Sequence, residues 1–469
     1  MPAKLSEYIP VEPGAMDPER GKPSDPETTA PVNDSPERIP VLVEQVPRLH
    51  FVVAWVFFLF VFSVPIEESS NTLGIPITMS KLFGFLFVLG CLVQPKICFR
   101  RPPQAFWWFF AYLCVTVVLG GMQEDRYSDE VTRLLATSVQ MAVLLWLACN
   151  MLRYEYIVRG ALISLALSCL MVAVLQRFGV GEAVDVSNYG RETRFSTFGQ
   201  NANEQAYTIG LGLLAMIGLT YGPWKSIVRP RWLIWPVFVF MVAAIVQTGS
   251  RGSMVAFGVG LAVYFMRGAG SEDRPVLGRN IAILSAAMAV VVGLSFLSEA
   301  ARLRWERTLQ SGHTSGRTVL ISLALDMIEE KPLFGWGAAA NRDELYLRSG
   351  EVSEGDFQNT ALHVLAEAGI FGAFPFFVGC FLWVRAAWLG RNGPLGILPL
   401  AMTATTLMVC LAGTWVYRKQ FWLVIALSLI SGKLLIRAKT YALAELELSP
   451  EPVRPMRRRL AVDGAAAES

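Results

Sequence analysis

Apolar residues fall in long runs along this chain, and short polar segments separate the runs. A run of about 17–25 apolar residues can cross a lipid bilayer as an α-helix, which satisfies its own backbone hydrogen bonds. The pattern predicts about twelve transmembrane helices, near residues 50–65, 76–93, 105–121, 134–150, 160–176, 203–221, 232–248, 253–267, 281–298, 360–384, 395–413 and 420–436.

The charged residues between these runs predict an orientation. If the N-terminus is cytoplasmic, every inner loop carries Lys or Arg, whereas the short outer loops "IEESSNTLG" and "MQEDRYSDE" are rich in acids. Positive residues collect on the cytoplasmic side of membrane proteins. We therefore expect both termini to be cytoplasmic and the number of spans to be even.

The same pattern divides the chain into five parts. Residues 1–48 are rich in Pro, Glu, Asp and Ser, which predicts a disordered cytoplasmic tail. Nine helices follow within 49–298, a large outer loop occupies 299–358, three more helices lie within 359–437, and a basic cytoplasmic tail occupies 438–469. In the outer loop, "TVLISLALDMIEEKPLFGWG" has apolar residues at helical spacing, which predicts an amphipathic helix along the outer face.

Composition agrees with an all-α integral membrane protein. Of the residues, 53% are hydrophobic and 17% are charged, against about 25% charged residues in soluble proteins. The net charge of +3 gives no indication of a nucleic-acid partner. The seven cysteines lie in or beside apolar runs, so we predict neither a disulfide framework nor a metal site.

Polar residues with possible chemistry gather in the segments expected on the outer face. Arg251 stands in a tight turn between two apolar runs, where the simplest interpretation is an arginine that anchors the turn at the membrane surface. Arg191 and Arg194 precede a helix start that is rich in amides. Arg317 stands at another expected helix start, with His313 just before it.

The segment "FQNTALHVLAEAGIFG" returns the chain to the membrane. Gln358 and Asn359 lie at its mouth, with His363 and Glu367 deeper in the expected helix. Arginines on one side of a membrane suit an anion, because the guanidinium group binds phosphate oxygens in pairs and stays charged. Helix N-termini add backbone donors, and amides can bind sugar hydroxyls. A lipid-linked diphosphate that carries a sugar fits this arrangement.

Four motifs in order carry a family resemblance: "G-x-x-x-N" at a helix start, "SRG" between two spans, "GR…PLFGWG" in the long loop, and "QNTALHVLAEAGIFG". From about residue 194 to 376 the chain resembles the O-antigen ligase and polymerase superfamily. The resemblance implies a GT-C-like inner-membrane glycosyltransferase without a cofactor or a metal. It implies transfer of a glycan from undecaprenyl diphosphate to an acceptor on the periplasmic face.

The resemblance also assigns roles to residues. Arg251 and Arg317 match the two arginines that hold the diphosphate, and Glu367 matches the acid of the final "E-x-G". The family usually has His-Asn where this chain has Gln358-Asn359. In ligases that histidine looks like the base that activates the acceptor, a role that glutamine cannot take because it does not accept a proton.

Several candidates remain for the missing base. They are His313, Asp356, Glu354 and Glu367, and a reaction that needs little help from a base is a further alternative. We interpret His363 as a core histidine. The residues that we expect to bind substrate are Arg191, Arg194, Asn201, Asn203, Asn359 and Asp356.

The sequence therefore predicts a metal-independent inverting glycosyltransferase of surface polysaccharide assembly. The acceptor is lipid A core in a ligase, a glycan repeat unit in a polymerase, or a protein hydroxyl. A transporter of lipid-linked oligosaccharide is one alternative, and it predicts charged or helix-breaking residues at mid-membrane depth. A catalytically silent homologue and a structural subunit are the others.

Overall fold

The computed structural model describes residues 49–67, 78–180, 182–185, 193–198, 200–223, 230–265, 274–311, 317–350 and 356–448. The tail expected to be disordered, residues 1–48, lies outside this part. All elements below belong to the unit that begins at Arg48.

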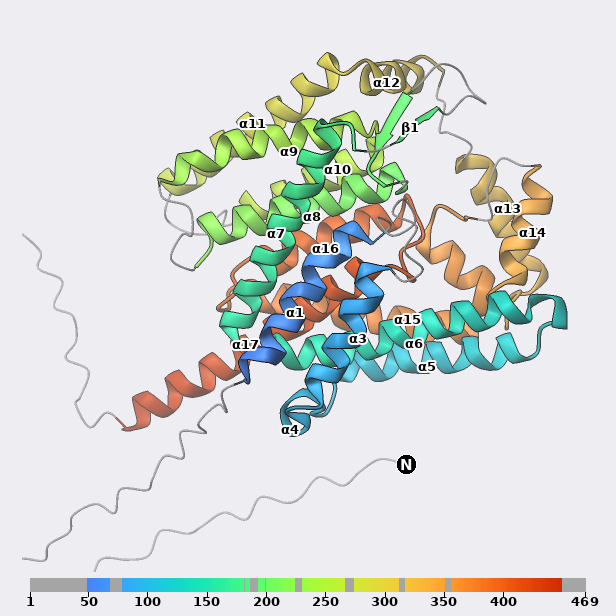
Figure 1. Ribbon diagram of the computed structural model, residues 1–469, viewed down its shortest axis with the longest axis horizontal. Helices are drawn as coiled ribbons and strands as arrows, with labels where there is room; N and C mark the ends of the chain where they lie inside the picture. The colour runs from blue at the N-terminus through green and yellow to red at the C-terminus, as the bar shows by residue number, and fades with distance from the viewer. Residues whose placement is uncertain are drawn as a thin grey trace, which may run out of the picture. The chain divides into compact units, whose positions relative to one another are not determined.

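Helices dominate the described part (Figure 1). In chain order the elements are α1 (Phe51–Ser63), η1 (Val64–Ile66), α3 (Met79–Cys91), α4 (Pro95–Cys98), α5 (Gln104–Gly121), η2 (Asp125–Tyr127), α6 (Ser128–Met151), α7 (Glu155–Arg177), β1 (Glu182–Asp185), β2 (Thr193–Ser196), α8 (Ala202–Tyr221), η4 (Arg231–Leu233), α9 (Ile234–Gln247), α10 (Arg251–Phe265), α11 (Arg274–Leu297), α12 (Glu299–Ser311), α13 (Arg317–Glu330), α14 (Ala340–Ser349), α15 (Thr360–Gly390), α16 (Leu398–Cys410) and α17 (Lys419–Leu448).

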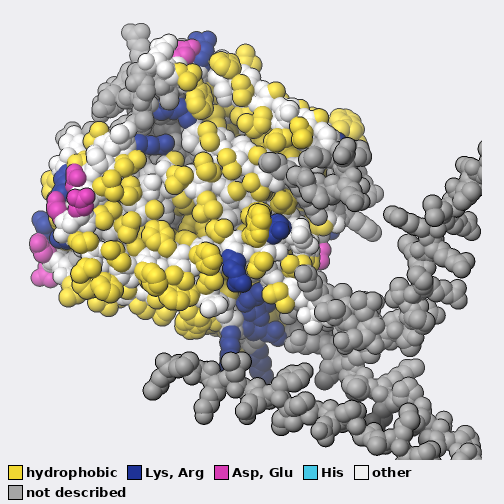
Figure 2. All heavy atoms as spheres, turned by 180° about the vertical axis from the view of Figure 1, so that it is seen from behind, with side chains coloured by type: hydrophobic (Ala, Val, Ile, Leu, Met, Phe, Trp, Pro, Cys, Tyr) yellow, Lys and Arg dark blue, Asp and Glu magenta, His cyan; other side chains and the backbone are white. Residues whose placement is uncertain are grey.

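Six of these helices are long and apolar enough to cross a membrane, namely α5, α6, α7, α11, α15 and α17. Shorter apolar helices occupy the ranges of α1, α3, α9, α10 and α16. Seen from behind, hydrophobic side chains cover much of the surface, and the acidic side chains visible there lie toward its margins (Figure 2). The expected all-α membrane architecture is confirmed, while the number of twelve spans stays a prediction.

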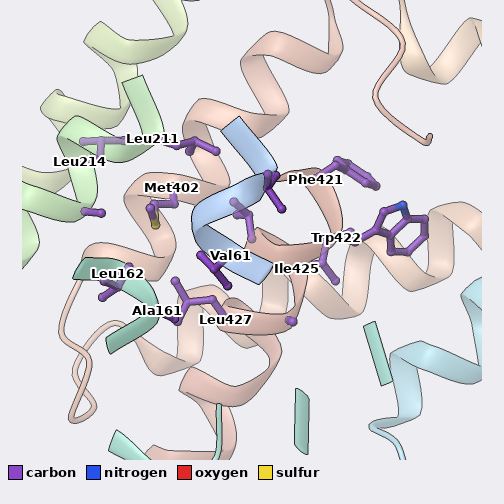
Figure 3. Close-up of a cluster of buried hydrophobic side chains, with 14 of the residues drawn as sticks. Val61, Ala161, Leu162, Leu211, Leu214, Met402, Phe421, Trp422, Ile425 and Leu427 are labelled. Carbon is purple, nitrogen blue, oxygen red and sulfur yellow. The ribbon is translucent and has the colours of Figure 1, made fainter. Parts of the chain in front are cut away.

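The core lies where helices from both halves of the chain meet. Side chains from α1, α7, α8, α16 and α17 interlock there, including Val61, Leu162, Leu211, Met402 and Ile425 (Figure 3). Small residues allow the closest contacts, as is usual between membrane helices. A Cβ atom on Gly260 of α10 would lie 2.0 Å from Thr405 Oγ1 of α16, so α10 packs almost backbone to side chain against α16.

Side-chain hydrogen bonds connect loops with one another into two groups, one at each of two opposite ends of the helices. On one face, Gln200 donates to the Pro65 carbonyl over 3.1 Å, and Gln123 donates to the Trp336 carbonyl over 3.1 Å. At the other end, Asn150 donates to the Cys98 carbonyl over 2.8 Å. The first group consists of loops that the sequence places outside and the second of loops that it places inside. We call the first group the site face.

The expected large loop, residues 299–358, contains more structure than the sequence pattern predicts. The expected helix is α13, and its buried residues Leu320 and Met327 pack with Leu345 of α14 and with Phe357. The sequence pattern did not predict α12, α14 or the antiparallel pair β1–β2, in which Glu182 faces Ser196.

At the C-terminal end, α17 continues to Leu448, beyond the predicted boundary at residue 437.

One long span is broken rather than continuous, contrary to expectation. Within α15, Gly369 has φ 58° and ψ −165°, a conformation that is nearly restricted to glycine. The motif "PLFGWG" docks at this break. Pro332 and Leu333 carbonyls accept from the amides of the second half of α15, at 2.8 and 3.1 Å, and the carbonyls of Ala366 and Glu367 accept from Trp336 and Gly337, both at 2.8 Å.

The two amides and two carbonyls at the break are therefore all hydrogen-bonded, so the break costs no stability through unpaired backbone groups at these four positions. Helix ends carry unsatisfied amides and carbonyls, and in a lipid environment such groups must be paired within the protein. The turn that supplies the partners belongs to the unit of α13 and α14. This arrangement fixes the position of that unit relative to α15 and so helps to place Arg317.

Candidate functional site

Two arginines meet on the site face. Arg251 is the first residue of α10 and Arg317 is the first residue of α13. A Cβ atom on Gly252 would lie 3.8 and 3.9 Å from the two terminal nitrogens of Arg317, so this guanidinium lies against the start of α10, beside Arg251. It donates to the Ala412 carbonyl over 3.4 Å and to Gln358 Oε1 over 3.2 Å.

The electrostatics of this pair favour a bound anion. Partial burial, followed by the positive charge of Arg251, lowers the pKa of Arg317, while the nearby Asp356 carboxylate acts in the opposite direction. The guanidinium group nevertheless remains charged at neutral pH. Two like charges held together repel each other, and an anion between them would relieve the repulsion.

The starts of α8 and α10 lie together at this site and strengthen the preference for an anion. Ser253, in the first turn of α10, donates to the Asn203 carbonyl of α8 over 2.9 Å, which brings the beginnings of α8 and α10 together. Helix N-termini carry partial positive charge and unpaired amides that bind phosphate groups. The site therefore combines two formal charges with the positive ends of two helix dipoles.

The segment before α15 forms a polar wall next to Arg317. Gln358 has φ +49°, in the left-handed region, and its backbone amide donates to Asp356 Oδ1 over 3.0 Å. Asp356 is exposed, and the same oxygen accepts from Thr414 Oγ1 over 2.6 Å. Asn359 caps α15, since its Oδ1 accepts from Ala361 and Leu362 at 3.0 and 3.1 Å.

The loop between α16 and α17 contributes residues that the sequence interpretation missed. Besides Thr414, it supplies Arg418, which lies 2.9 Å from Glu204 of α8. A signal was present, because "YRK" puts two cations in a short loop on the side expected to be poor in positive residues. This ion pair ties the loop before α17 to the start of α8.

Glu367 lies away from this polar surface, in a buried cluster at the break of α15. Its side chain is 1% exposed. Tyr417 donates to its two oxygens at 2.8 and 2.9 Å, Tyr112 donates at 3.4 Å, and His363 Nε2 lies 2.8 Å from Oε2. Burial, followed by the charge of Glu367, raises the pKa of Tyr417 well above its ordinary value, so this phenol stays protonated as a donor.

The amides near the start of α8 form hydrogen bonds within the protein, and several other candidate residues lie outside the described part. Gln205 is buried and donates to Gln176 Oε1 over 2.8 Å, so it serves the fold. Asn201 caps α8 by accepting from the Asn203 amide over 2.9 Å. Arg194 lies on β2, with its side chain outside the described part. His313, Arg191 and Glu354 also lie outside the described residues.

The comparison with protein families decides the classification. Residues 236–377 match the family model described as O-antigen ligase. This segment is similar to the O-antigen ligase family. The match runs from α9 into α15 and contains Arg251, Arg317 and Gln358. No curated protein matches the chain at a significant level.

The resemblance that the motifs predict is thereby confirmed. The match indicates a function of the ligase or polymerase type in polysaccharide assembly, in a multi-pass membrane protein. It also implies a lipid-linked glycan and an acceptor as partners. The superfamily members are glycosyltransferase-like enzymes.

Tyr417 should be important for stability because it connects the loop before α17 to the buried carboxylate. Tyr417→Phe removes both donations to Glu367, and a hydrogen bond to a charged group contributes about 1.5–3 kcal/mol. We expect a lower melting temperature in detergent and reduced transfer activity, since Arg418 and Thr414 belong to the same loop. A suitable control is Tyr207→Phe, which removes only the 2.8 Å contact with the Thr406 hydroxyl.

Glu367→Gln tests whether Glu367 positions the surrounding tyrosines or acts as the base that accepts the proton of the acceptor. The amide oxygen still accepts from one tyrosine, so a positioning residue keeps much of its activity and an unchanged pH profile. A catalytic base loses nearly all activity on the same substitution. Wild-type stability in Tyr417→Phe, or inactivity of a fully folded Glu367→Gln, contradicts the positioning role.

Proposed function

We propose that the protein transfers a glycan from undecaprenyl diphosphate to an acceptor hydroxyl on the site face of the membrane. We assign this face to the periplasm, because the loops at the opposite end carry the Lys and Arg residues typical of the cytoplasmic side. The enzyme is then a ligase or a polymerase in the inner membrane. Its acceptor is lipid A core, a glycan repeat unit or a protein hydroxyl.

The observation that carries the proposal is the meeting of Arg251 and Arg317. Arg317 is the first residue of a helix in the extramembrane loop, and Arg251 is the first residue of an apolar helix. A group that satisfies both must lie at the boundary between membrane and water. A diphosphate attached to a polyprenol chain lies at that depth and has the charge to neutralise both guanidinium groups.

The proposed reaction is a direct displacement at the anomeric carbon. The acceptor oxygen forms a bond to that carbon from one side, while the bond to the diphosphate oxygen breaks on the other, so the configuration inverts. The leaving diphosphate takes the bonding electron pair, and Arg251 and Arg317 stabilise its increased charge. The acceptor proton moves to a base. The proposal assigns charge neutralisation to arginines rather than to a metal ion.

Asp356 is the best placed of the candidate bases in the described part. It is exposed next to Gln358, the position where the family resemblance leads us to expect a histidine, and it lies close enough to Arg317 to raise the pKa of that guanidinium group. The Gln358 amide and the Thr414 hydroxyl both bind Oδ1. These two contacts orient the carboxylate that we assign as the acceptor of the proton.

Asp356→Asn should lower kcat by about 10²–10⁴-fold, the usual contribution of general acid–base catalysis. The amide keeps an oxygen for the Gln358 and Thr414 contacts but accepts no proton. Transfer is measured by mass spectrometry of the product from a purified lipid-linked donor. A matched control is Asp343→Asn on α14, which changes a carboxylate of the same unit outside the proposed site. Unchanged kcat in Asp356→Asn removes this residue as the base.

The broken helix α15 is the observation that favours a transporter as a second candidate. Transporters commonly use discontinuous helices near the middle of the membrane. Here the backbone groups at the break bind the "PLFGWG" turn, and the Glu367 carboxylate binds two tyrosines. These contacts support a docking role for the break. Proteoliposomes that move the lipid-linked glycan without forming a transfer product would favour the transporter instead.

A further inference from the structure

A cavity opens between α3 and α6, away from the arginine pair. On one side α3 packs against α1, but toward α6 there is a groove with a volume of about 360 Å³. Its walls are almost entirely apolar and come from helices in the apolar part of the molecule. They include Phe60, Gly84, Phe87, Val139 and Leu144.

One end of this groove is polar and cationic. Lys81 and Ser80 stand in the first turn of α3, and Lys419 begins α17. All three line the groove. Lys419 is buried, forms an ion pair with Glu67, and lies 3.1 Å from Ser80 Oγ. Glu67 follows η1 and Lys419 begins α17, next to loops of the site face, so the cationic end of the groove lies toward that face.

The shape and chemistry of the groove fit a lipid. Apolar cavities of this size are costly when empty and do not hold water without polar partners. A hydrocarbon chain from the surrounding bilayer can enter between two helices and fill the space. The lysine in the first turn of α3 then lies at the level of the lipid head group, where basic residues attract anionic lipids.

The contacts at the polar end favour a bilayer lipid over the chain of the glycan donor. Lys419, which lines the groove, pairs with Glu67, and its chain neighbour Arg418 pairs with Glu204 at the start of α8. A donor chain that entered the groove at its polar end would have to pass the Lys419–Glu67 pair. Lys81 is exposed at the rim and can meet a head group without disturbing either pair.

We propose that the groove between α3 and α6 binds an acidic phospholipid, with one acyl chain along Phe87 and Leu144 and the phosphate at Lys81. The bound lipid fills the space between the α1–α3 pair and α6. This site is separate from the proposed transfer reaction and does not depend on it.

The test uses the full chain reconstituted into nanodiscs that contain phosphatidylglycerol with a diazirine in one acyl chain. After illumination, peptides are mapped by mass spectrometry. We expect labelling on α3 and α6. Val139→Trp places a large ring in the groove, and Val139 is 48% exposed, so the fold should tolerate it. This variant should lose most of the labelling, whereas Val118→Trp on α5, a position that is 61% exposed, should not.

The charge at the rim gives a second measurement. Lys81→Gln should weaken retention of phosphatidylglycerol in native mass spectrometry about fivefold, while Lys96→Gln, on the opposite face, should leave it unchanged. Equal retention of phosphatidylcholine and phosphatidylglycerol by the wild type overturns the proposal. So does labelling that Val139→Trp does not reduce, or labelling of α3 and α6 by a diazirine polyprenyl diphosphate that excludes phosphatidylglycerol.

Discussion

Arg317→Ala and Arg251→Ala should each lower glycan transfer by at least about 10²–10³-fold, the loss seen when one group that stabilises developing charge is removed. Arg317 should show the larger effect, because its guanidinium also binds Gln358 and the Ala412 carbonyl. The effect should fall mainly on kcat, since the negative charge on the leaving diphosphate increases in the transition state. Transfer is measured with purified lipid-linked donor at matched protein levels.

Two further variants sharpen this test. Arg317→Lys keeps the charge but loses the planar fork of donors, so it should recover only part of the activity. Arg126→Ala removes an arginine from another loop of the site face, where its side chain is 66% exposed and pairs with Glu124. It should transfer like the wild type. Wild-type turnover in either Arg251→Ala or Arg317→Ala contradicts the proposed site.

The hydrophobic pattern was sufficient to place most helices, because a membrane helix is recognised by its own length and composition. The predicted range 105–121 became α5 and the range 203–221 became α8, each of which begins one residue earlier than predicted and ends where predicted. The sequence also indicated where some helices begin. Asn201 and Asn359 both cap helices, as short polar side chains at helix N-termini usually do.

The arrangement of the site could be predicted only in part. The motifs indicated that Arg251 and Arg317 act together, and the structure brings them to the same place. The partners of Glu367 were not predictable, since Tyr112 and Tyr417 are distant in sequence and carry no local signal for a buried carboxylate. The break in α15 was also missed, because "EAGIFG" continues an apolar run. The backbone partners that stabilise the break come from a turn 30 or more residues earlier in the chain.

That break leads to the second large expected effect. Gly369→Ala should prevent stable folding, with a loss beyond about 4 kcal/mol, a size seen only when core or backbone geometry is disrupted. A Cβ atom at this position would lie 2.3 Å from the carbonyl carbon and oxygen of Leu333, and backbone atoms cannot rotate away as a side chain can. The backbone angles at Gly369 are also strongly unfavourable for alanine.

Gly350→Ala is the matched control for this effect. Gly350 also has a positive φ, 56°, but a Cβ atom there meets nothing within 4 Å, so alanine should cost only about 1–2 kcal/mol of backbone strain. Thermal unfolding in detergent measures both variants. If the two are equally stable, the close approach of Leu333 to the break is not important. If Gly369→Ala alone fails, the docking of "PLFGWG" on α15 holds the Arg317 unit in place, and any activity that remains should fall with it.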